Sequence, residues 1–324
     1  MRFFHAIAML AAAALPCLGA SARNLNARSG TDAPPRLYLV QNFWGFDSLR
    51  SKDTPWTREQ ALAEIKAAGF DAVDVWGSGM SDVDADAWKA LAGKYGLGMG
   101  MEGGPNRPED LPALIATARR LGSPYLDLHV SNYFLPEKEA TELLRALSEG
   151  CKREDIAMVT QTHRGRVTQD LIRTVGYAQA IPDLRFDLDL SHYFVAGEIG
   201  GTPGAEAQKR FDVLMERAVM LDGRVSNGEQ VQIDMGPDAD NEQTRVFAGL
   251  WKRVMIGWLK TANRGDLFPF RVELGPPGYA ILDPAGREVS DRWGQQKLMA
   301  RLVERLWNEA VREAGWGQAH VGGR

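Results

Sequence analysis

Cysteine is scarce in this chain, and its scarcity limits the forces that can hold the fold together. The 324 residues contain two cysteines, Cys17 and Cys151. Cys17 lies in a leader that we expect to be removed, so Cys151 would be left as a single thiol and an intrachain disulfide is excluded. Cys151 has no adjacent histidine to activate it and is interpreted as packing, not as a nucleophile. Stability must therefore come from a hydrophobic core.

The sequence also lacks a large excess of charge of either sign. It has 38 Lys and Arg against 42 Asp and Glu, a formal net charge of −4. Proteins whose affinity depends on neutralising phosphates along a nucleic acid carry a strongly basic face, so we expect no nucleic-acid partner. A small neutral or carbohydrate-like ligand fits this composition better.

Long hydrophobic runs are absent after residue 35, so we expect no transmembrane span there. The first residues differ, because Arg2 precedes an apolar run over residues 7–18 and then Ala20-Ser21-Ala22, which has the form of a cleavage site. This pattern predicts a signal peptide over residues 1–22 and a periplasmic or secreted protein without membrane contact after cleavage. A buried N-terminal helix is the alternative. Residues 23–35, rich in turn formers, are interpreted as a linker.

From residue 36 onward, short apolar runs rich in β-formers alternate with amphipathic stretches, as is typical of parallel strands joined by helices. Eight such units can be counted, and hydrophobic residues make up 44% of the chain, enough for a large core. The predicted strands centre on residues 37–42, 72–76, 98–102, 125–129, 157–162, 185–190, 219–225 and 269–273. About 250 residues suffice for one (β/α)8 barrel. We therefore predict an α/β fold, a single TIM barrel over residues 36–315, followed by a flexible tail, 316–324.

Polar side chains gather at the predicted ends of the later strands. In such a barrel these ends face one shared cup, where active sites lie. Three of the five histidines fall there: His129, His163 and His192. Oxygen-bearing side chains come from four successive strands: Gln161, Asp189, Asp222 and Glu273. Three inward carboxylates repel one another unless they are neutralised, so the set predicts a divalent cation, Mn²⁺ or Mg²⁺, or alternatively ion pairs with Arg164, Arg166 or Arg224.

Four short runs at these strand ends carry a recognisable pattern. They are Thr162-His163-Arg164-Gly165-Arg166-Val167-Thr168-Gln169-Asp170-Leu171, Asp189-Leu190-Ser191-His192-Tyr193, Gly223-Arg224-Val225 and Glu273-Leu274-Gly275-Pro276-Pro277. Together they resemble the sugar phosphate isomerase/epimerase family of the xylose isomerase-like TIM barrels, over roughly residues 36–310. The resemblance implies a divalent metal held by a Glu, an Asp, a His and a Glu. Those places fall on Gln161, Asp189, Asp222 and Glu273.

Two of these four places depart from the family pattern. Gln161 stands where a Glu is expected and Asp222 where a His is expected, which keeps the total charge and favours oxygen-preferring cations over zinc. Since Gln161 cannot take up a proton, the resemblance implies that Glu273, with His192 or His163, transfers a proton next to a carbonyl. One base and one acid also suffice for β-elimination. A lyase acting on a keto-glycoside therefore stays open, as does a non-catalytic carbohydrate-binding barrel with a degenerate metal site.

The other residues of the predicted cup suit a polyol, since arginines donate several hydrogen bonds and aromatic rings offer flat apolar faces to a sugar. The predicted substrate-binding residues are His129, Arg164, Arg166, Arg224, Trp44 and Trp76. A secreted protein rarely meets sugar phosphates, so we expect an isomerase or epimerase for an unphosphorylated sugar or sugar derivative. The pattern carries no prediction of the oligomeric state.

Overall fold

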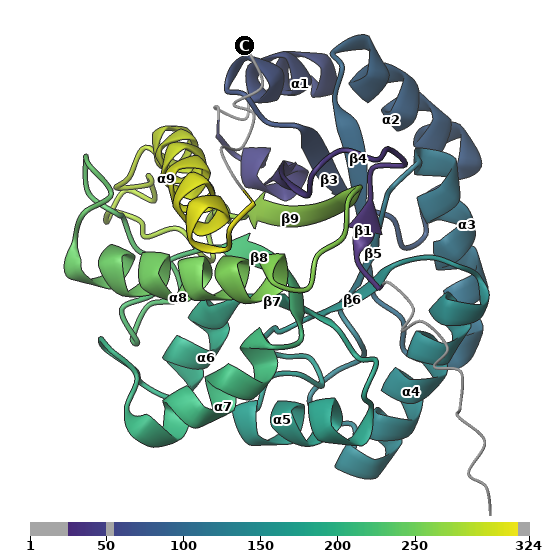
Figure 1. Ribbon diagram of the computed structural model, residues 1–324. Helices are drawn as coiled ribbons and strands as arrows, with labels where there is room; N and C mark the ends of the chain where they lie inside the picture. Colours follow the sequence, from purple (N-terminus) through teal and green to yellow (C-terminus); the bar gives the residue numbers. More distant parts are fainter. Residues whose placement is uncertain (1–24, 50–54, 317–324) are drawn as a thin grey trace, which may run out of the picture.

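The computed structural model describes residues 25–49 and 55–316. Within these residues eight parallel strands close into a barrel that a ring of helices surrounds (Figure 1). The barrel strands are β2 (Arg36–Asn42), β3 (Ala72–Trp76), β4 (Gly98–Gly103), β5 (Leu126–Leu128), β6 (Met158–Gln161), β7 (Phe186–Leu188), β8 (Ala218–Gly223) and β9 (Asp266–Val272). The predicted single TIM barrel is confirmed.

The barrel closes because its last strand pairs with its first. β9 runs parallel to β2 over six positions, from Arg36 opposite Leu267 to Gln41 opposite Val272, and it also pairs with β8. The strands lie where the apolar runs predicted them. β7 is shorter than predicted because Asp189 leaves the ladder to cap the next helix, its side chain accepting from the Ser191 amide.

Helices cover the outer wall, and several begin at a residue whose side chain caps them, such as Thr57, Ser81, Asp170 and Asn241. They are α1 (Arg58–Ala67), α2 (Asp82–Lys94), α3 (Leu111–Leu121), α4 (Glu137–Arg153), α5 (Leu171–Ala180), α6 (Leu190–Ala196), α7 (Ala205–Met215), α8 (Glu242–Leu259) and α9 (Arg292–Glu313). Thr57 forms a capping box with Gln60 at the start of α1. On α9 Leu302, Leu306 and Val311 are buried. The amphipathic stretches between the predicted strands are therefore helices, as the alternating pattern indicated.

Part of the segment interpreted as a linker pairs with the barrel. The strand β1 (Ala27–Arg28) runs antiparallel to β9, with Ala27 opposite Leu267. The Ser29 amide donates to the Gly265 carbonyl at 2.8 Å. These contacts lie at the start of β9, which is the end of the barrel opposite the predicted cup. A two-residue strand leaves no periodic signal, so the sequence could not indicate it.

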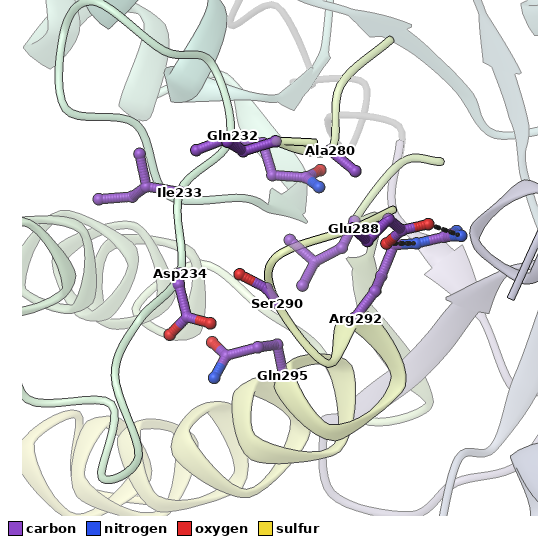
Figure 2. A pocket seen from close by; sticks show the side chains of 10 residues that line it. Gln232, Ile233, Asp234, Ala280, Glu288, Ser290, Arg292 and Gln295 are labelled. Carbon is purple, nitrogen blue, oxygen red and sulfur yellow. Dashed lines mark hydrogen bonds and ion pairs between the residues drawn. The ribbon is translucent and has the colours of Figure 1, made fainter. Parts of the chain in front are cut away.

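A long loop between β9 and α9 lies over the barrel mouth and is held by Arg292. The Arg292 side chain is buried, pairs with Glu288 at 2.8 Å and donates to the main-chain oxygens of Gly45 and Asp47. Figure 2 shows the Arg292–Glu288 pair beside a cavity of about 20 Å³ behind this loop. That volume is enough for one water molecule. One buried arginine thus fastens the loop to the segment after β2.

The remaining predictions about the chain ends concern few described residues. The predicted signal peptide, residues 1–22, lies outside them, as does the tail beyond Trp316. Trp316 itself donates its indole N–H to the Leu259 carbonyl at 2.8 Å. Within the part of the chain that the structure describes, no helix is both long and apolar enough to cross a membrane. Cys151 is buried on α4, and burial raises the pKa of its thiol, which agrees with a packing role.

Candidate active site

Polar side chains fill the interior of the barrel near the C-terminal ends of its strands. Side chains two residues apart in a strand point to the same side, and four such pairs point inward. The pairs are Asp127 and His129, Asp187 and Asp189, Asp222 and Arg224, and Arg271 and Glu273; all eight residues are buried. The first members of the pairs form a lower layer and the second members an upper layer, nearer the barrel mouth.

Arg271 on β9 is the centre of the lower layer. Its guanidinium nitrogens lie 2.7 to 3.5 Å from carboxylate oxygens contributed by five other strands. These carboxylates belong to Asp74, Glu102, Asp127, Asp187 and Asp222. Asp222 is held twice, by Nε at 2.7 Å and by Nη2 at 2.8 Å. Arg271 therefore acts as an internal cation that ties the strands of the barrel together.

Arg224, just after β8, joins two of the predicted metal ligands in the upper layer. Its Nη2 lies 2.8 Å from Oε2 of Glu273, and its Nη1 pairs with Oδ2 of Asp189. The second carboxylate oxygen of Asp189 accepts from the Ser191 amide at 2.9 Å. The second oxygen of Glu273 accepts from the Asn42 side chain at 2.9 Å. The ion pairing considered from the sequence thus exists for Asp189 and Glu273, through Arg224.

Seven carboxylates surround the two guanidinium groups of Arg271 and Arg224, so negative charge exceeds positive charge in the barrel interior. Burial raises the pKa of Glu273 well above its ordinary value, and the nearby Asp222 charge raises it further. Burial raises the pKa of Asp189 to about 6. Asp222 differs, because the charge and hydrogen bonds of Arg271 outweigh burial and hold its pKa below the ordinary value. The interior therefore holds either extra protons or a further cation.

Three of the four predicted metal-binding residues come together. Asp189, Asp222 and Glu273 each offer a carboxylate oxygen, and these atoms lie within 4.8 Å of one another. Gln161 donates its amide N–H to Asp222 at 2.6 Å, which leaves its Oε1 buried without a hydrogen-bond partner. A buried amide oxygen without a partner beside three carboxylates is a donor set typical of a hard cation. These residues fit Mg²⁺ or Mn²⁺, which would share two of the carboxylates with Arg224 and the third with Arg271.

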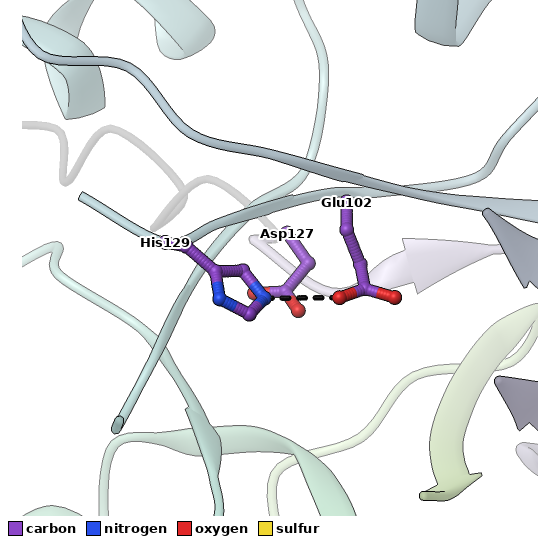
Figure 3. A group of neighbouring side chains, drawn as sticks. All are labelled: Glu102, Asp127 and His129. Carbon is purple, nitrogen blue, oxygen red and sulfur yellow. Dashed lines mark hydrogen bonds and ion pairs between the residues drawn. The ribbon is translucent and has the colours of Figure 1, made fainter. Parts of the chain in front are cut away.

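Glu102, Asp127 and His129 form a second group that could hold a metal ion. In Figure 3 a hydrogen bond joins His129 to Glu102, at 3.0 Å, with the Asp127 carboxylate beside them. Burial and the charge of Arg271 hold the pKa of His129 well below its ordinary value, so its imidazole is neutral. Because Glu102 and Asp127 also face Arg271, a cation bound here would share these carboxylates with the guanidinium group.

His163 and His192, the predicted partners of Glu273, have ring centroids 4.1 Å apart. Nδ1 of His163 contacts the Arg164 carbonyl oxygen, which only accepts, so Nδ1 carries the proton. Nε2 of His163 then accepts from the Tyr279 hydroxyl at 3.1 Å. His163 lines the cavity described next, whereas His192 is 1% exposed and is not one of the described residues lining it. The geometry favours His163 for contact with a substrate.

A cavity of about 590 Å³ opens at the C-terminal ends of the strands. Its lining includes Glu273 and four of the six predicted substrate-binding residues: His129, Arg166, Trp44 and Trp76. The other two contact Tyr279, since the guanidinium carbons of Arg164 and Arg224 are each 4.8 Å from the centre of its ring. Tyr279 itself lines the cavity. Both arginines thus contact a residue of the cavity wall without lining the cavity themselves.

Sequence reasoning missed Arg271, Asn42 and Tyr279. A signal existed for Arg271, because it lies two residues before Glu273 in a predicted strand and so must share its inward face. A weaker signal existed for Asn42, the last residue of the first barrel strand, whose amide bridges Glu273 and Glu102 at 2.9 Å each. Tyr279 lies in an irregular loop, and no periodic pattern could have placed it.

Comparison with known proteins shows which solved structures share this fold. No family model and no curated protein matches the chain. Solved structures do match: an L-ribulose 3-epimerase has a TM-score of 0.59 at 13% identity, over 89% of this chain and 100% of that one. A D-allulose 3-epimerase from Methylomonas sp. in complex with D-allulose has a TM-score of 0.57 at 14% identity, over 84% of this chain and 98% of that one.

A third structure carries a metal. It is a xylose isomerase-like TIM barrel protein from Mycobacterium smegmatis in complex with magnesium, with a TM-score of 0.55 at 11% identity over 84% of this chain and 98% of that one. The chain therefore has the xylose isomerase-like TIM-barrel fold that its motifs implied. At such low identity the likeness concerns the fold, and function must be argued from the site.

Proposed function

We propose that this protein is a sugar isomerase or epimerase that acts on an unphosphorylated sugar or sugar derivative by metal-assisted proton transfer next to a carbonyl. The observation that carries the proposal is the position of Glu273. Its carboxylate lines the cavity and also belongs to the group of oxygens that could hold a cation. A base and a cation site would then meet at one point on the substrate.

The residues around Glu273 suit this role. Burial raises the pKa of Glu273, which makes its carboxylate a stronger base than an exposed glutamate. Asn42 and Arg224 each donate to one of its oxygens and so fix its orientation. A divalent cation held by Gln161, Asp189, Asp222 and Glu273 would polarise the substrate carbonyl. Arg166 lines the same cavity and can donate hydrogen bonds to substrate hydroxyls, and His129, whose Nε2 bonds to Glu102, offers them its Nδ1.

Sugar-binding neighbours and the N-terminal pattern support the choice of substrate. The neighbour in complex with D-allulose is a ketose epimerase, and the L-ribulose 3-epimerase acts on another ketose. We propose that the protein is exported, because residues 1–22 have the pattern of a signal peptide. An exported enzyme meets unphosphorylated sugars, so free ketoses are the first substrates to test.

Proton exchange tests the proposal directly. Protein loaded with Mn²⁺ is incubated in D₂O with D-fructose, D-allulose, D-tagatose or L-ribulose, and deuterium on the carbon next to the carbonyl is followed by NMR. We expect exchange that EDTA abolishes and that Glu273→Gln slows by at least about 100-fold, the lower range for loss of a general base. Glu142→Gln is the matched control, because the Glu142 side chain is exposed on α4.

Other outcomes assign other functions. If the protein converts a keto-glycoside into an unsaturated sugar and a released group, the reaction is β-elimination and not isomerisation. β-Elimination needs the same base. Sugar binding that ignores EDTA, with no exchange and no product from any ketose, would show a non-catalytic carbohydrate-binding barrel and overturn the proposal.

A further inference from the structure

The cavity has two halves of different chemistry. Glu273, His129, His163 and Arg166 follow the later strands and gather titratable groups at one side. The half over β2 and β3 holds most of the aromatic side chains of the lining, beside the charged Asp47, Arg58 and Asp84. Its lining comes from the segments that follow these two strands and includes Phe43, Trp44, Trp76, Met80 and Trp88. We refer to these five residues as the aromatic half.

The cavity is larger than a monosaccharide needs. Its volume of about 590 Å³ lies within the range of roughly 300–1,000 Å³ found for pockets that take drug-sized ligands. A single ketohexose is much smaller than such a ligand. If the sugar carbonyl lies near Glu273, the aromatic half remains unfilled.

Trp76 is the clearest sign that something covers the aromatic half. It ends β3, and its side chain is 45% exposed, although large apolar surfaces are normally buried. One side of its ring packs against Gly104, where an added Cβ would lie 3.0 Å from the ring. Its ring centroid is 5.2 Å from that of His129. Trp76 is thus held in place at the boundary between the two halves of the cavity.

Polar groups beside the aromatic half could orient a second ring. The Arg58 guanidinium lies 4.5 Å above the Trp88 ring and pairs with Asp84 at 2.6 Å. Phe43 supports the same ring edge-on, with centroids 4.7 Å apart. Arg58 and Asp84 both line the cavity and offer a donor and an acceptor for hydroxyl groups. Flat apolar faces next to such a pair are suited to a sugar ring or another ring with hydroxyl groups.

We propose that the aromatic half binds a second ring of the substrate, so that the physiological substrate is a two-ring glycoside of a keto sugar and not a free monosaccharide. This inference rests on the proposed function for the position of the carbonyl. The second ring would lie against the indole of Trp76, with its hydroxyl groups towards Arg58 and Asp84.

Matched sugars with one ring and two rings test this inference. Binding of D-fructose and of lactulose, which is D-fructose carrying a galactose, is measured by calorimetry on the Mn²⁺-loaded protein. D-glucose and cellobiose form a second pair. We expect lactulose to bind about tenfold more tightly than D-fructose, the factor that corresponds to one well-placed aromatic contact, and the aldose pair to show whether the second ring alone gives this gain. In Trp76→Ala the affinity ratio should fall towards one, and in Trp76→Phe it should be largely kept.

The control for Trp76→Ala is Phe134→Ala, because Phe134 is 76% exposed in the segment after β5 and does not line the cavity. Three results would overturn the inference. One-ring and two-ring sugars could bind with equal affinity, the preference for two rings could survive Trp76→Ala, or none of the four sugars could bind. The proposed function is tested separately by deuterium exchange. If the protein prefers two-ring sugars but catalyses no exchange, the second-ring site is supported and the isomerase or epimerase activity is rejected.

Discussion

Arg224 links the stability of the upper layer to its chemistry. One guanidinium group pairs with Asp189 and Glu273, two of the three carboxylates that could hold a cation. Buried charges need a partner, and here that partner is built into the chain. A cation bound beside Arg224 would therefore neutralise only the part of the carboxylate charge that Arg224 leaves uncompensated.

Replacing Arg224 should separate these two roles. Arg224→Gln leaves two carboxylates buried without their partner, so the free energy of unfolding in EDTA should fall by about 3–5 kcal/mol. Mn²⁺ should then stabilise the variant more than the wild type, because both carboxylates become available. Urea unfolding with EDTA and with Mn²⁺ measures both effects. Arg245→Gln, at an exposed pair with Asp240, is the control; equal Mn²⁺ stabilisation of variant and wild type would contradict the competition described here.

At the scale of elements, the loop between β9 and α9 determines where Tyr279 lies. Tyr279 lines the cavity and contacts His163, yet its loop has little regular structure. Arg292 holds the loop in place, because its side chain binds both Glu288 in the loop and main-chain oxygens after β2. The position of Tyr279 thus depends on a residue in α9 that does not itself touch the cavity described for the substrate.

Arg292→Met should loosen this loop without emptying the space that the side chain fills. Carbonyl oxygens left without partners cost about 1–3 kcal/mol, so we expect a loss of stability of that size in urea unfolding. KM for the exchanging sugar should rise more than kcat falls, because Tyr279 of this loop lines the cavity proposed for the substrate. Arg287→Met is the control, since Arg287 pairs with Asp283 in the same loop but is 80% exposed. An unchanged KM in the Arg292 variant would show that the loop does not position the substrate.

At the scale of the whole molecule, the excess of buried carboxylates makes stability depend on pH and on cations. Folding raises the pKa of Asp74 from 3.8 to about 7 and that of Asp189 from 3.8 to about 6, in both cases chiefly by burial. Above pH 4 the folded protein therefore holds more protons at these groups than the unfolded chain does. These two carboxyls therefore make stability fall as the pH rises from about 4 to 7, whereas His129, His163 and His192, whose pKa values burial lowers, act in the opposite direction.

The contribution of Asp189 can be isolated in EDTA by circular dichroism: the change in Tm from about pH 5 to about pH 7.5 should be more favourable in Asp189→Asn than in the wild type, because the variant has no carboxyl there to deprotonate. Mn²⁺ should raise Tm more at the higher pH, because its ligands must lose their protons before they bind. Asp189→Asn, which removes one carboxylate of the cation group, should lose most of this gain. A gain in Tm that is equal at both pH values would show that these carboxylates do not bind the cation.

The sequence by itself determined the barrel. Alternating strands and amphipathic helices depend on local periodicity, so eight units, their order and most of their bounds could be predicted without tertiary contacts. Inward positions such as Asp189, Asp222 and Glu273 followed from the same periodicity, because the ends of parallel strands in a barrel face one cup.

Only the tertiary structure decided what neutralises these groups. The sequence offered Arg164, Arg166 and Arg224 as partners for Asp189, and the choice among them depends on distances across the barrel. In the structure Asp189 pairs with Arg224, and Arg271 lies among five further carboxylates. The position of Tyr279 also depends on a loop that a distant arginine holds. Local pattern specifies elements, whereas electrostatic partners are specified by how those elements pack.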